Sequence, residues 1–329
     1  MARTRTTRLL GVVLAAASLA ACGNSEDTAG ADAADAETGS DEAITITDSR
    51  GEEVVLEDGP AERVVALEWM HAENLVTLGV QPVGVADVDG YTTWAGASAP
   101  LDDDVADVGT RSEPSVDAII DLEPDLILAE ADSSEDLLAQ MEKFAPVLVV
   151  AGSDASDNLG RMRAAFETIG QAVGRDDDAT QALDDFDAFL ADSKAALTEA
   201  GVADDGFAMA DGWMDGSTVS IRMFGEGSLM SDLAEAVGLE NQWTGEVDEV
   251  WGLGTTDVEG LTGLGDLHFV YSASEEDVFE TGLSSNPVWS NLPFVASGDV
   301  HKLDTGTWTF GGPAAARFFV EQVVEALTT

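Results

Sequence analysis

The segment QALDDFDAFLADSKAALTE, residues 181–199, decides the architecture of this chain. Its residues Leu183, Phe186, Leu190, Ser193 and Leu197 recur at helical spacing, with aspartate-rich positions between them. This pattern predicts one long amphipathic helix. No strand candidate occurs from residue 158 to residue 200, whereas strands and helices alternate on both sides. We therefore expect a stiff helical connection between two halves.

Both halves carry short apolar runs separated by helical patterns. The predicted strands cover residues 44–47, 54–56, 63–67, 83–85, 125–129 and 147–150 before the long helix, and 207–210, 218–224, 268–271 and 299–303 after it. The predicted helices cover residues 73–78, 116–122, 228–237 and 313–327. Alternating strands and helices favour mainly parallel sheets covered by helices. We predict an α/β fold with two Rossmann-like lobes, residues 43–175 and 201–329, joined by a single long helix over residues 176–200.

The N-terminus has the form of an export signal. Arg3, Arg5 and Arg8 precede an apolar run over residues 9–21, which is too short to span a bilayer permanently. LAAC at residues 19–22 resembles a bacterial lipobox, which implies a lipoprotein signal peptide over residues 1–21 and acylation of Cys22. The alternative is an ordinary secretory signal, but Cys22 is the only cysteine and lipidation explains it. Residues 22–42 then form a disordered tether, and the protein is extracytoplasmic, anchored to the cell membrane by its lipid.

The charge balance excludes one class of partner. The chain has 64 acidic and 14 basic residues, a formal net charge of −50. This sign argues against binding nucleic acid through a basic surface. We interpret the acidity as a solvated surface suited to a salty habitat, and we expect a monomer that touches the membrane only through its anchor.

The residues offer little for catalysis or for a resident metal. No nucleophile elbow, phosphate-binding loop or dinucleotide fingerprint occurs. His71, His268 and His301 are the only histidines, and we place the last two inside strands. We expect no enzyme activity, no metal site and no cofactor.

Several motifs appear together along the chain. They are LEW at residues 67–69, GVQPVGVAD at 79–87, VGTRSEPSVD at 108–117, LEPDLI at 122–127, FGEGSL at 224–229, NPVW at 286–289 and GGP at 311–313. In this order they resemble the iron-siderophore binding proteins of ABC importers, the type with a rigid helix between two lobes. The resemblance covers nearly all of the chain after the tether. It is strongest to the ferric-hydroxamate binding lipoproteins, and it implies a ligand cleft between the lobes.

The resemblance also implies a set of ligand-binding residues. An arginine contacts the iron-coordinating oxygens, and aromatic rings pack the organic shell; both roles suit the chemistry. The matching positions are Arg111, Tyr91, Trp94, Trp251 and Trp308, with Trp69 and Arg222 as further candidates. We place Tyr91 and Trp94 in a loop exposed at the cleft. Trp69 fits the core and the cleft equally, and the alternative for Arg111 is a surface ion pair.

The implied function is capture of a ferric siderophore for iron uptake, with the iron carried as cargo inside the ligand. The scarcity of arginines favours a neutral or cationic hydroxamate over a multiply anionic catecholate or citrate complex. The alternatives are haem, with His71 as the residue to watch, cobalamin or a bare metal ion. The partner is a permease with its cytoplasmic ATPase, and the implied docking residues are Asp117, with Glu113 beside it, and Glu259.

Overall fold

A computed structural model describes residues 42–329, which belong to one compact unit. The expected signal peptide, Cys22 and all of the tether except Glu42 lie outside the described residues. Within the described part, no helix combines the length and the apolar character needed to cross a membrane.

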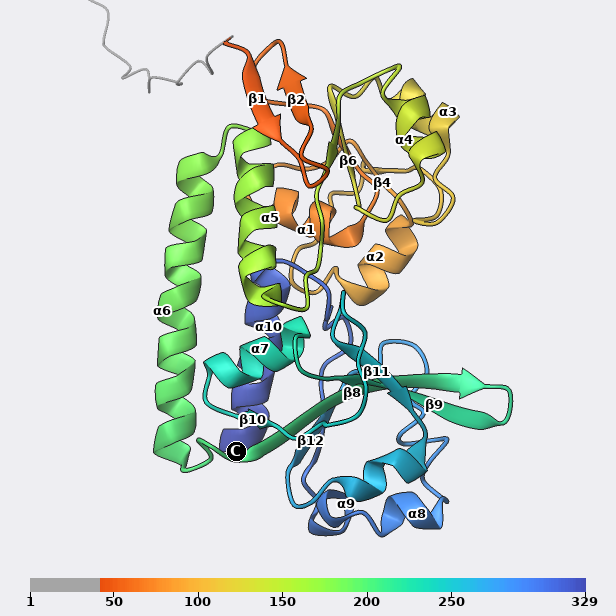
Figure 1. Cartoon of the computed structure of the whole chain (residues 1–329), viewed down its shortest axis with the longest axis vertical. Helices are drawn as coiled ribbons and strands as arrows, with labels where there is room; N and C mark the ends of the chain where they lie inside the picture. The colour runs from red at the N-terminus through yellow and green to blue at the C-terminus, as the bar shows by residue number, and fades with distance from the viewer. Residues whose placement is uncertain (1–41) are drawn as a thin grey trace, which may run out of the picture. The chain divides into compact units, whose positions relative to one another are not determined.

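The first lobe is built on a parallel sheet (Figure 1). Its strands, in the spatial order β5-β4-β3-β6-β7, are β5 (Ala106–Asp107), β4 (Gly84–Val85), β3 (Val64–Ala66), β6 (Leu126–Ala129) and β7 (Val147–Val149). Three of these strands, VVA, LILA and VLV, are buried at every position, as expected where helices cover both faces. A separate antiparallel hairpin pairs β1 (Ile44–Thr47) with β2 (Glu53–Leu56). The helices of this lobe are α1 (Trp69–Thr77), α2 (Val88–Trp94), α3 (Val116–Asp121), α4 (Glu135–Met141) and α5 (Asn158–Ala172).

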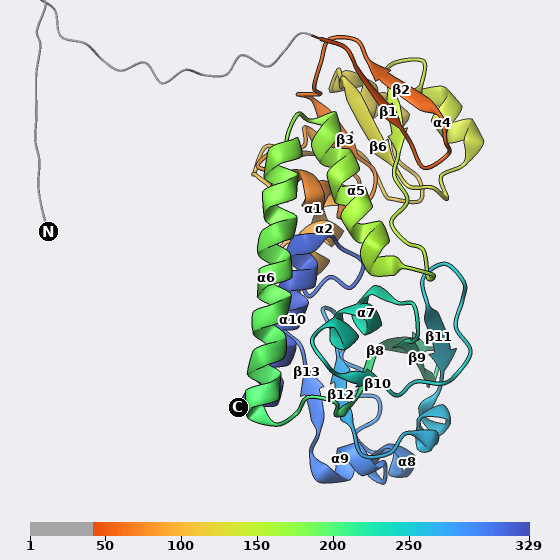
Figure 2. The ribbon, with the colours of Figure 1, turned by 60° about the vertical axis from the view of Figure 1, so that its left-hand side comes forward.

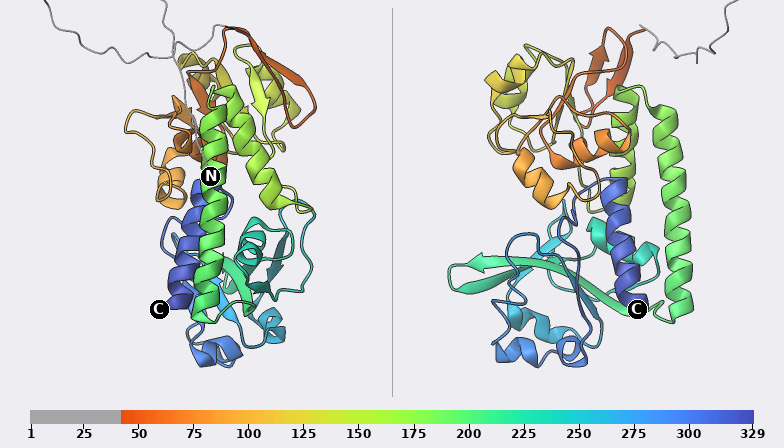
Figure 3. Two further views of the ribbon diagram at one scale, coloured as in Figure 1. Left: turned by 90° about the vertical axis from the view of Figure 1, so that its left-hand side faces the viewer. Right: turned by 180° about the vertical axis from the view of Figure 1, so that it is seen from behind.

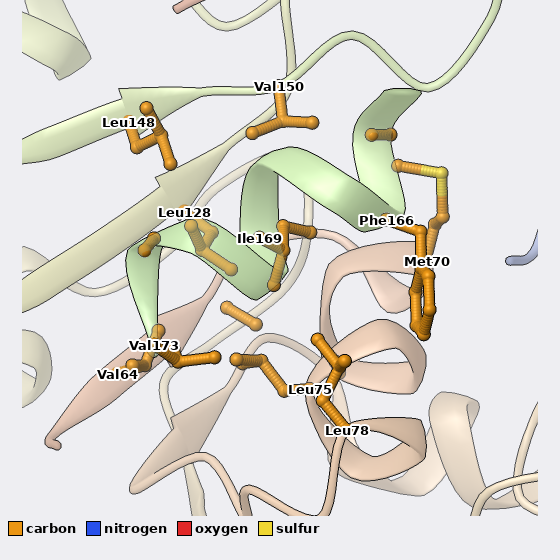
Figure 4. Packing of buried hydrophobic residues seen from close by; sticks show 14 of the residues in the cluster. Val64, Met70, Leu75, Leu78, Leu128, Leu148, Val150, Phe166, Ile169 and Val173 are labelled. Atoms are coloured by element: carbon orange, nitrogen blue, oxygen red, sulfur yellow. The ribbon is translucent and has the colours of Figure 1, made fainter. Parts of the chain in front are cut away.

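One of the two core layers of this lobe lies between the sheet and helices α1 and α5, and the other involves α3 and α4. Leu128 and Leu148 come from the strands, Leu75 from α1, and Phe166 and Ile169 from α5 (Figure 4). All five side chains are fully buried. Burial of such side chains contributes about 1.5–3 kcal/mol each, so this layer holds α1 and α5 firmly on the sheet.

The second lobe carries a mixed sheet. Its strands, in the spatial order β11-β9-β8-β12-β13, are β11 (Leu253–Thr256), β9 (Thr218–Phe224), β8 (Gly206–Asp215), β12 (His268–Tyr271) and β13 (Val300–Lys302). A further short strand, β10 (Glu240–Asn241), pairs with the start of β8. The helices are α7 (Leu229–Ala236), the 3₁₀ helix Val258–Gly263, α8 (Pro287–Ser290), α9 (Pro293–Ser297) and α10 (Pro313–Thr328).

Strands β8 and β9 form one long antiparallel hairpin, which the sequence pattern did not reveal. The apolar run of β8 ends at Ala210, so the interpretation placed the strand over residues 207–210 only. The strand continues through Asp211 to Asp215, and Gly216 takes a positive φ of 61° at the turn. Only a residue without a Cβ adopts this conformation freely.

The predicted long helix is confirmed as α6 (Asp176–Ala200), which begins five residues earlier than the amphipathic pattern. Asp176, Asp177 and Asp178 lie in its first turn, where negative charge is favourable, and Gly201 ends it in the left-handed conformation. Leu183 packs in the first lobe's core, whereas Phe186 packs in a core of the second lobe. The helix therefore contributes to both cores.

Helix α10 lies alongside α6 (Figures 2 and 3) and also contributes to both lobes. Its first turn supplies Ala315 to the first lobe's core, and Phe319, Val320 and Val323 belong to the second. The predicted fold with two α/β lobes is confirmed. The covalent connection through α6 is reinforced by this second helix.

Candidate ligand-binding cleft

A cavity of about 580 Å³ is lined by both lobes. The first lobe contributes the start of α1, the end of α2 and the loops after β5, β6 and β7. The second lobe contributes β9, β11 and the loops before β11 and after β13. The lining residues are Glu68, Trp69, Met70, Trp94, Arg111, Glu130, Asp132, Gly152, Arg222, Trp251, Leu253, Trp308 and Phe310. This volume lies within the usual range of about 300–1,000 Å³ for small-molecule sites.

Four aromatic rings form a continuous wall across this cavity. Trp69 contacts Trp308 with ring centroids 4.9 Å apart, and Trp308 contacts Phe310 at 5.2 Å. Phe310 in turn meets Trp251 edge-to-face at 5.3 Å. Trp69, at the start of α1, is fixed by its indole N–H, which donates to the Ala86 carbonyl at 3.0 Å. The wall therefore spans both lobes and contributes apolar surface to the cavity.

Arg111 lies on this wall. Its guanidinium carbon is 4.0 Å from the Trp69 ring centroid, and its Nη1 donates to Glu68 Oε1 at 2.7 Å. The loop that carries Arg111 is closed by a bridge between Gly109 and Pro114, and Gly109 has a φ of 98°. A Cβ at Gly109 would lie 3.0 Å from the Ser115 nitrogen, so the tight turn requires glycine.

Arg222 has a similar environment on the second lobe. It faces Asp211 across the β8–β9 pair, with its Nε 3.0 Å from Asp211 Oδ1. Its guanidinium carbon lies 4.9 Å from the Phe310 ring centroid. Burial raises the pKa of Asp211, and the charge of Arg222 opposes that rise. Each cleft arginine is therefore already paired with a carboxylate and stacked on an aromatic ring.

Acidic groups outnumber basic groups on the cavity wall. The lining carboxylates are Glu68, Glu130 and Asp132, and the lining cations are Arg111 and Arg222. Glu130 accepts hydrogen bonds from the backbone N–H groups of Ala131 and Gly152, both at 2.9 Å. Burial raises the pKa of Glu130 above its ordinary value. The wall thus offers a ligand no excess of positive charge.

Glu73 anchors the segment that supplies Trp308 and Phe310. It is fully buried on α1, and it accepts hydrogen bonds from the backbone N–H groups of Gly312 and Ala315, the latter at 2.9 Å. These groups belong to the start of α10, where the helix dipole also favours a negative charge. The two lobes are therefore joined directly behind the aromatic wall.

Six of the seven residues expected to bind ligand line this cavity. They are Arg111, Trp94, Trp251, Trp308, Trp69 and Arg222. The ambiguity over Trp69 is resolved by geometry, because it is 4 % exposed and belongs to both the core and the cavity wall.

The placement of Tyr91 and Trp94 in a loop was wrong, because both residues belong to helix α2. Tyr91 lies in helix α2 and has no exposed surface. Its hydroxyl donates to the Ala99 carbonyl at 2.6 Å, and burial raises its pKa. Polar neighbours in the sequence suggested a loop, but the helix turns Tyr91 inward, while Trp94, one turn later, lines the cavity.

The sequence interpretation missed Phe310, Glu68 and Glu130. Phe310 stands two residues after Trp308 in the segment GTWTFGG, residues 306–312, and alternation along an extended segment was the signal that could have revealed it. Glu68 precedes Trp69 in the motif LEW. No sequence pattern indicated that Glu130 lines the cavity, because only the folded structure brings the end of β6 to it.

The expected docking residues lie away from the cavity wall. Asp117, in the first turn of α3, is exposed, as are Glu113 and Glu259, the last in the 3₁₀ helix of the second lobe. His71, in contrast, is fully buried on α1, and its Nε2 lies 3.0 Å from the Val150 carbonyl.

Comparison with known families identifies the class of protein. The family described as "Periplasmic binding protein" matches residues 64–306, and the chain belongs to this family. It is thus an extracytoplasmic binding protein.

Particular relatives narrow the comparison. The chain is 26% identical over 267 residues to the iron(3+)-hydroxamate-binding protein FhuD of Escherichia coli, with 80% of this chain and 86% of the relative covered. It is 29% identical to the Fe(3+)-citrate-binding protein YfmC of Bacillus subtilis, with 93% of each covered. Among solved structures, the siderophore-binding protein FhuD of Vibrio cholerae bound to Fe3+-Desferal superimposes with a TM-score of 0.74 at 28% identity, covering 82% of this chain and 98% of the other.

Proposed function

We propose that this chain is the substrate-binding component of an ABC importer and that it captures a ferric siderophore of the hydroxamate type in the cleft. The observation that carries the ligand class is the pairing of both cleft arginines, Arg111 with Glu68 and Arg222 with Asp211. A multiply anionic complex would need unpaired cations to offset its charge. A neutral or cationic ferric hydroxamate needs only donors for its partly charged oxygens and apolar surface for its linkers.

The relatives support the same ligand class. The names of the relatives from Escherichia coli and Vibrio cholerae refer to hydroxamate binding and to bound Fe3+-Desferal. The relative YfmC is named for ferric citrate, which makes the anionic complex the competing candidate. The iron is cargo inside the ligand, and the proposal gives the protein no cofactor of its own.

A ligand series separates the two candidates. We expect cationic ferrioxamine and neutral ferrichrome to quench the tryptophan fluorescence with affinities of about 1 µM or tighter, which corresponds to about −8 kcal/mol. Ferric dicitrate, added to the same protein, should quench only at far higher concentration. Tighter binding of the dicitrate complex would reverse the ligand assignment.

Arg111→Ala should weaken hydroxamate binding by about 1.5–3 kcal/mol, or roughly 10–150-fold, because a charge-assisted hydrogen bond is lost. Arg317→Ala is the matched control, since Arg317 is exposed on α10 and pairs with Glu321 away from the cavity. Equal affinities for the two variants would remove Arg111 from the site.

Haem is the less favoured cargo because of the position of His71. Its ring is fully buried beneath the cavity wall and contacts the Val150 carbonyl and the Glu130 carboxylate, the latter at 3.9 Å. An axial ligand must reach the iron, and this ring would have to leave the core to do so.

The proposal extends to transport. Cys22 carries the lipid that holds the chain at the membrane, and the protein works as a monomer with a permease and its ATPase. Asp117, Glu113 and Glu259 are exposed and so are free to meet cations on the permease. Reversal of Asp117 and Glu259 to arginine should abolish siderophore-dependent iron uptake while fluorescence titration shows unchanged binding. Normal uptake by that double variant would exclude these residues from docking.

A further inference from the structure

A second cluster of ligand-type side chains lies outside the cleft. His268, Asp299 and His301 each offer one donor atom, and the three atoms lie within 4.8 Å of one another. The imidazole rings of His268 and His301 have centroids 5.5 Å apart. Asp299 Oδ1 lies 4.0 Å from His268 Nδ1.

The sheet register explains why these residues meet. Parallel strands β12 and β13 pair Phe269 with Val300 and Val270 with His301. His268 and Asp299 directly precede the first of these pairs. Because side chains alternate along a strand, all three residues point to the same face as Val270. The prediction that His268 and His301 lie in two strands is confirmed, and these strands, β12 and β13, are neighbours in the sheet.

Two of the ring nitrogens in this cluster are buried without a hydrogen-bond partner in the part of the chain that the structure describes. His268 Nδ1 and His301 Nε2 are shielded from solvent and have no hydrogen-bond partner among the described residues. An unsatisfied buried polar atom costs roughly 1–3 kcal/mol, so such atoms call for an explanation. The other nitrogen of His268, Nε2, lies 3.6 Å from Asp205 Oδ2. A carboxylate behind a histidine is the arrangement that orients metal-binding imidazoles.

We propose that His268, His301 and Asp299 bind one divalent transition-metal ion of the Zn²⁺ type, with Asp205 orienting His268. Two nitrogens and one oxygen suit Zn²⁺, whereas Ca²⁺ and Mg²⁺ require mostly oxygen ligands. Tetrahedral ligands at about 2.0–2.1 Å from zinc stand roughly 3.3 Å apart. A modest rotation of the side chains therefore brings the three donor atoms close enough to bind one ion. Water completes the coordination.

The proposed metal site lies away from the ligand-binding cleft. The cluster lies at the start of β12, whereas Trp308 and Phe310, which line the cleft, follow the end of the parallel strand β13. The bound ion would connect the edge strand β13 to β12 and to the loop before β8. It would thus stabilise the second lobe without being cargo, and the net charge of −50 would draw cations towards it.

The test uses Zn²⁺ itself, with the purified chain in excess Mg²⁺ and 1 M NaCl to occupy and screen surface carboxylates. We expect one Zn²⁺ per chain by calorimetry and a rise in melting temperature. His301→Gln and His268→Gln should each weaken binding at least tenfold, and Asp205→Asn about tenfold. His301→Leu should retain its melting temperature without metal and lose the Zn²⁺-dependent rise.

Two controls decide the assignment. The chain has only three histidines, so NMR should show Zn²⁺ shifting two imidazoles and leaving that of His71 unchanged. Asp266→Asn removes an exposed carboxylate two residues from His268, and it should bind Zn²⁺ as well as the wild type, whereas Asp299→Asn should not. Equal effects of the two aspartate changes, or unshifted imidazoles, would mean an adventitious ion only. In all of these variants, ferrioxamine should quench the tryptophan fluorescence with the same affinity as in the wild type. The test of the metal site is therefore independent of the proposed transport function.

Discussion

The buried carboxyl of Glu73 makes the stability of the protein depend on pH. Burial raises its pKa from 4.5 to about 7, although backbone N–H groups of α10 oppose that rise. A group with a raised folded pKa contributes stability below its unfolded pKa, and that stability is lost as pH rises through the folded pKa. The difference between the two pKa values corresponds to about 3 kcal/mol, lost mostly between about pH 4.5 and pH 7.

The substitution Glu73→Gln removes this titration while keeping the shape of the side chain. At pH 5 the protonated carboxyl and the carboxamide are nearly equivalent, so the two proteins should have similar free energies of unfolding. At pH 8 the wild type carries the cost of a buried charge, and the variant should be more stable by about 3 kcal/mol.

Urea unfolding followed by tryptophan fluorescence at pH 5 and pH 8 measures this difference. We would use 1 M NaCl to screen the repulsion of the acidic surface. Glu62→Gln, which makes the same charge change at an exposed residue, should follow the wild type at both pH values. A Glu73→Gln variant that is less stable than the wild type by the same amount at both would refute the reasoning. It would show that the hydrogen bonds to Gly312 and Ala315 outweigh burial and keep Glu73 ionised.

Three further results are expected. Tyr91→Phe should cost about 1 kcal/mol of stability through loss of the bond to the Ala99 carbonyl, and siderophore titration should show unchanged affinity. Trp251→Ala should weaken siderophore binding about tenfold or more in the same titration, because it removes one end of the aromatic wall. Cys22→Ala should release the protein from membranes on fractionation, and a membrane-bound variant would disprove the lipid anchor.

Much of the fold could be predicted because its signals are local. Leu183 and Phe186 share one face of a helix by spacing alone, and the three buried strands of the first lobe are short apolar runs bounded by polar residues. The β8–β9 hairpin escaped prediction because its outer half, DGWMD at residues 211–215, lacks apolar alternation. That half is held by cross-strand pairs such as Asp211 with Arg222, which depend on contacts distant in the sequence.

The site was predictable only where a motif carried the information. Arg111 and Trp308 were found through family motifs and line the cavity. Tyr91 was misplaced because the polar sequence around it forms a helix whose buried side depends on packing against the rest of the lobe. The pairing of His268 with Asp299 and His301 follows from the adjacency of β12 and β13, which no local pattern encodes.

The pairing of the cleft arginines bears on ligand selection. In a chain with 64 acidic and 14 basic residues, an unpaired arginine in the cleft would attract nearby carboxylates, and the fold supplies Glu68 and Asp211 as fixed partners. Each guanidinium has more donors than one carboxylate can use, so it can still donate to a ligand oxygen. A ligand that binds without displacing these partners must bring little negative charge of its own. We therefore attribute the proposed preference for a neutral or cationic hydroxamate to two arginines whose charges are already neutralised by Glu68 and Asp211, but which can still donate hydrogen bonds to the ligand.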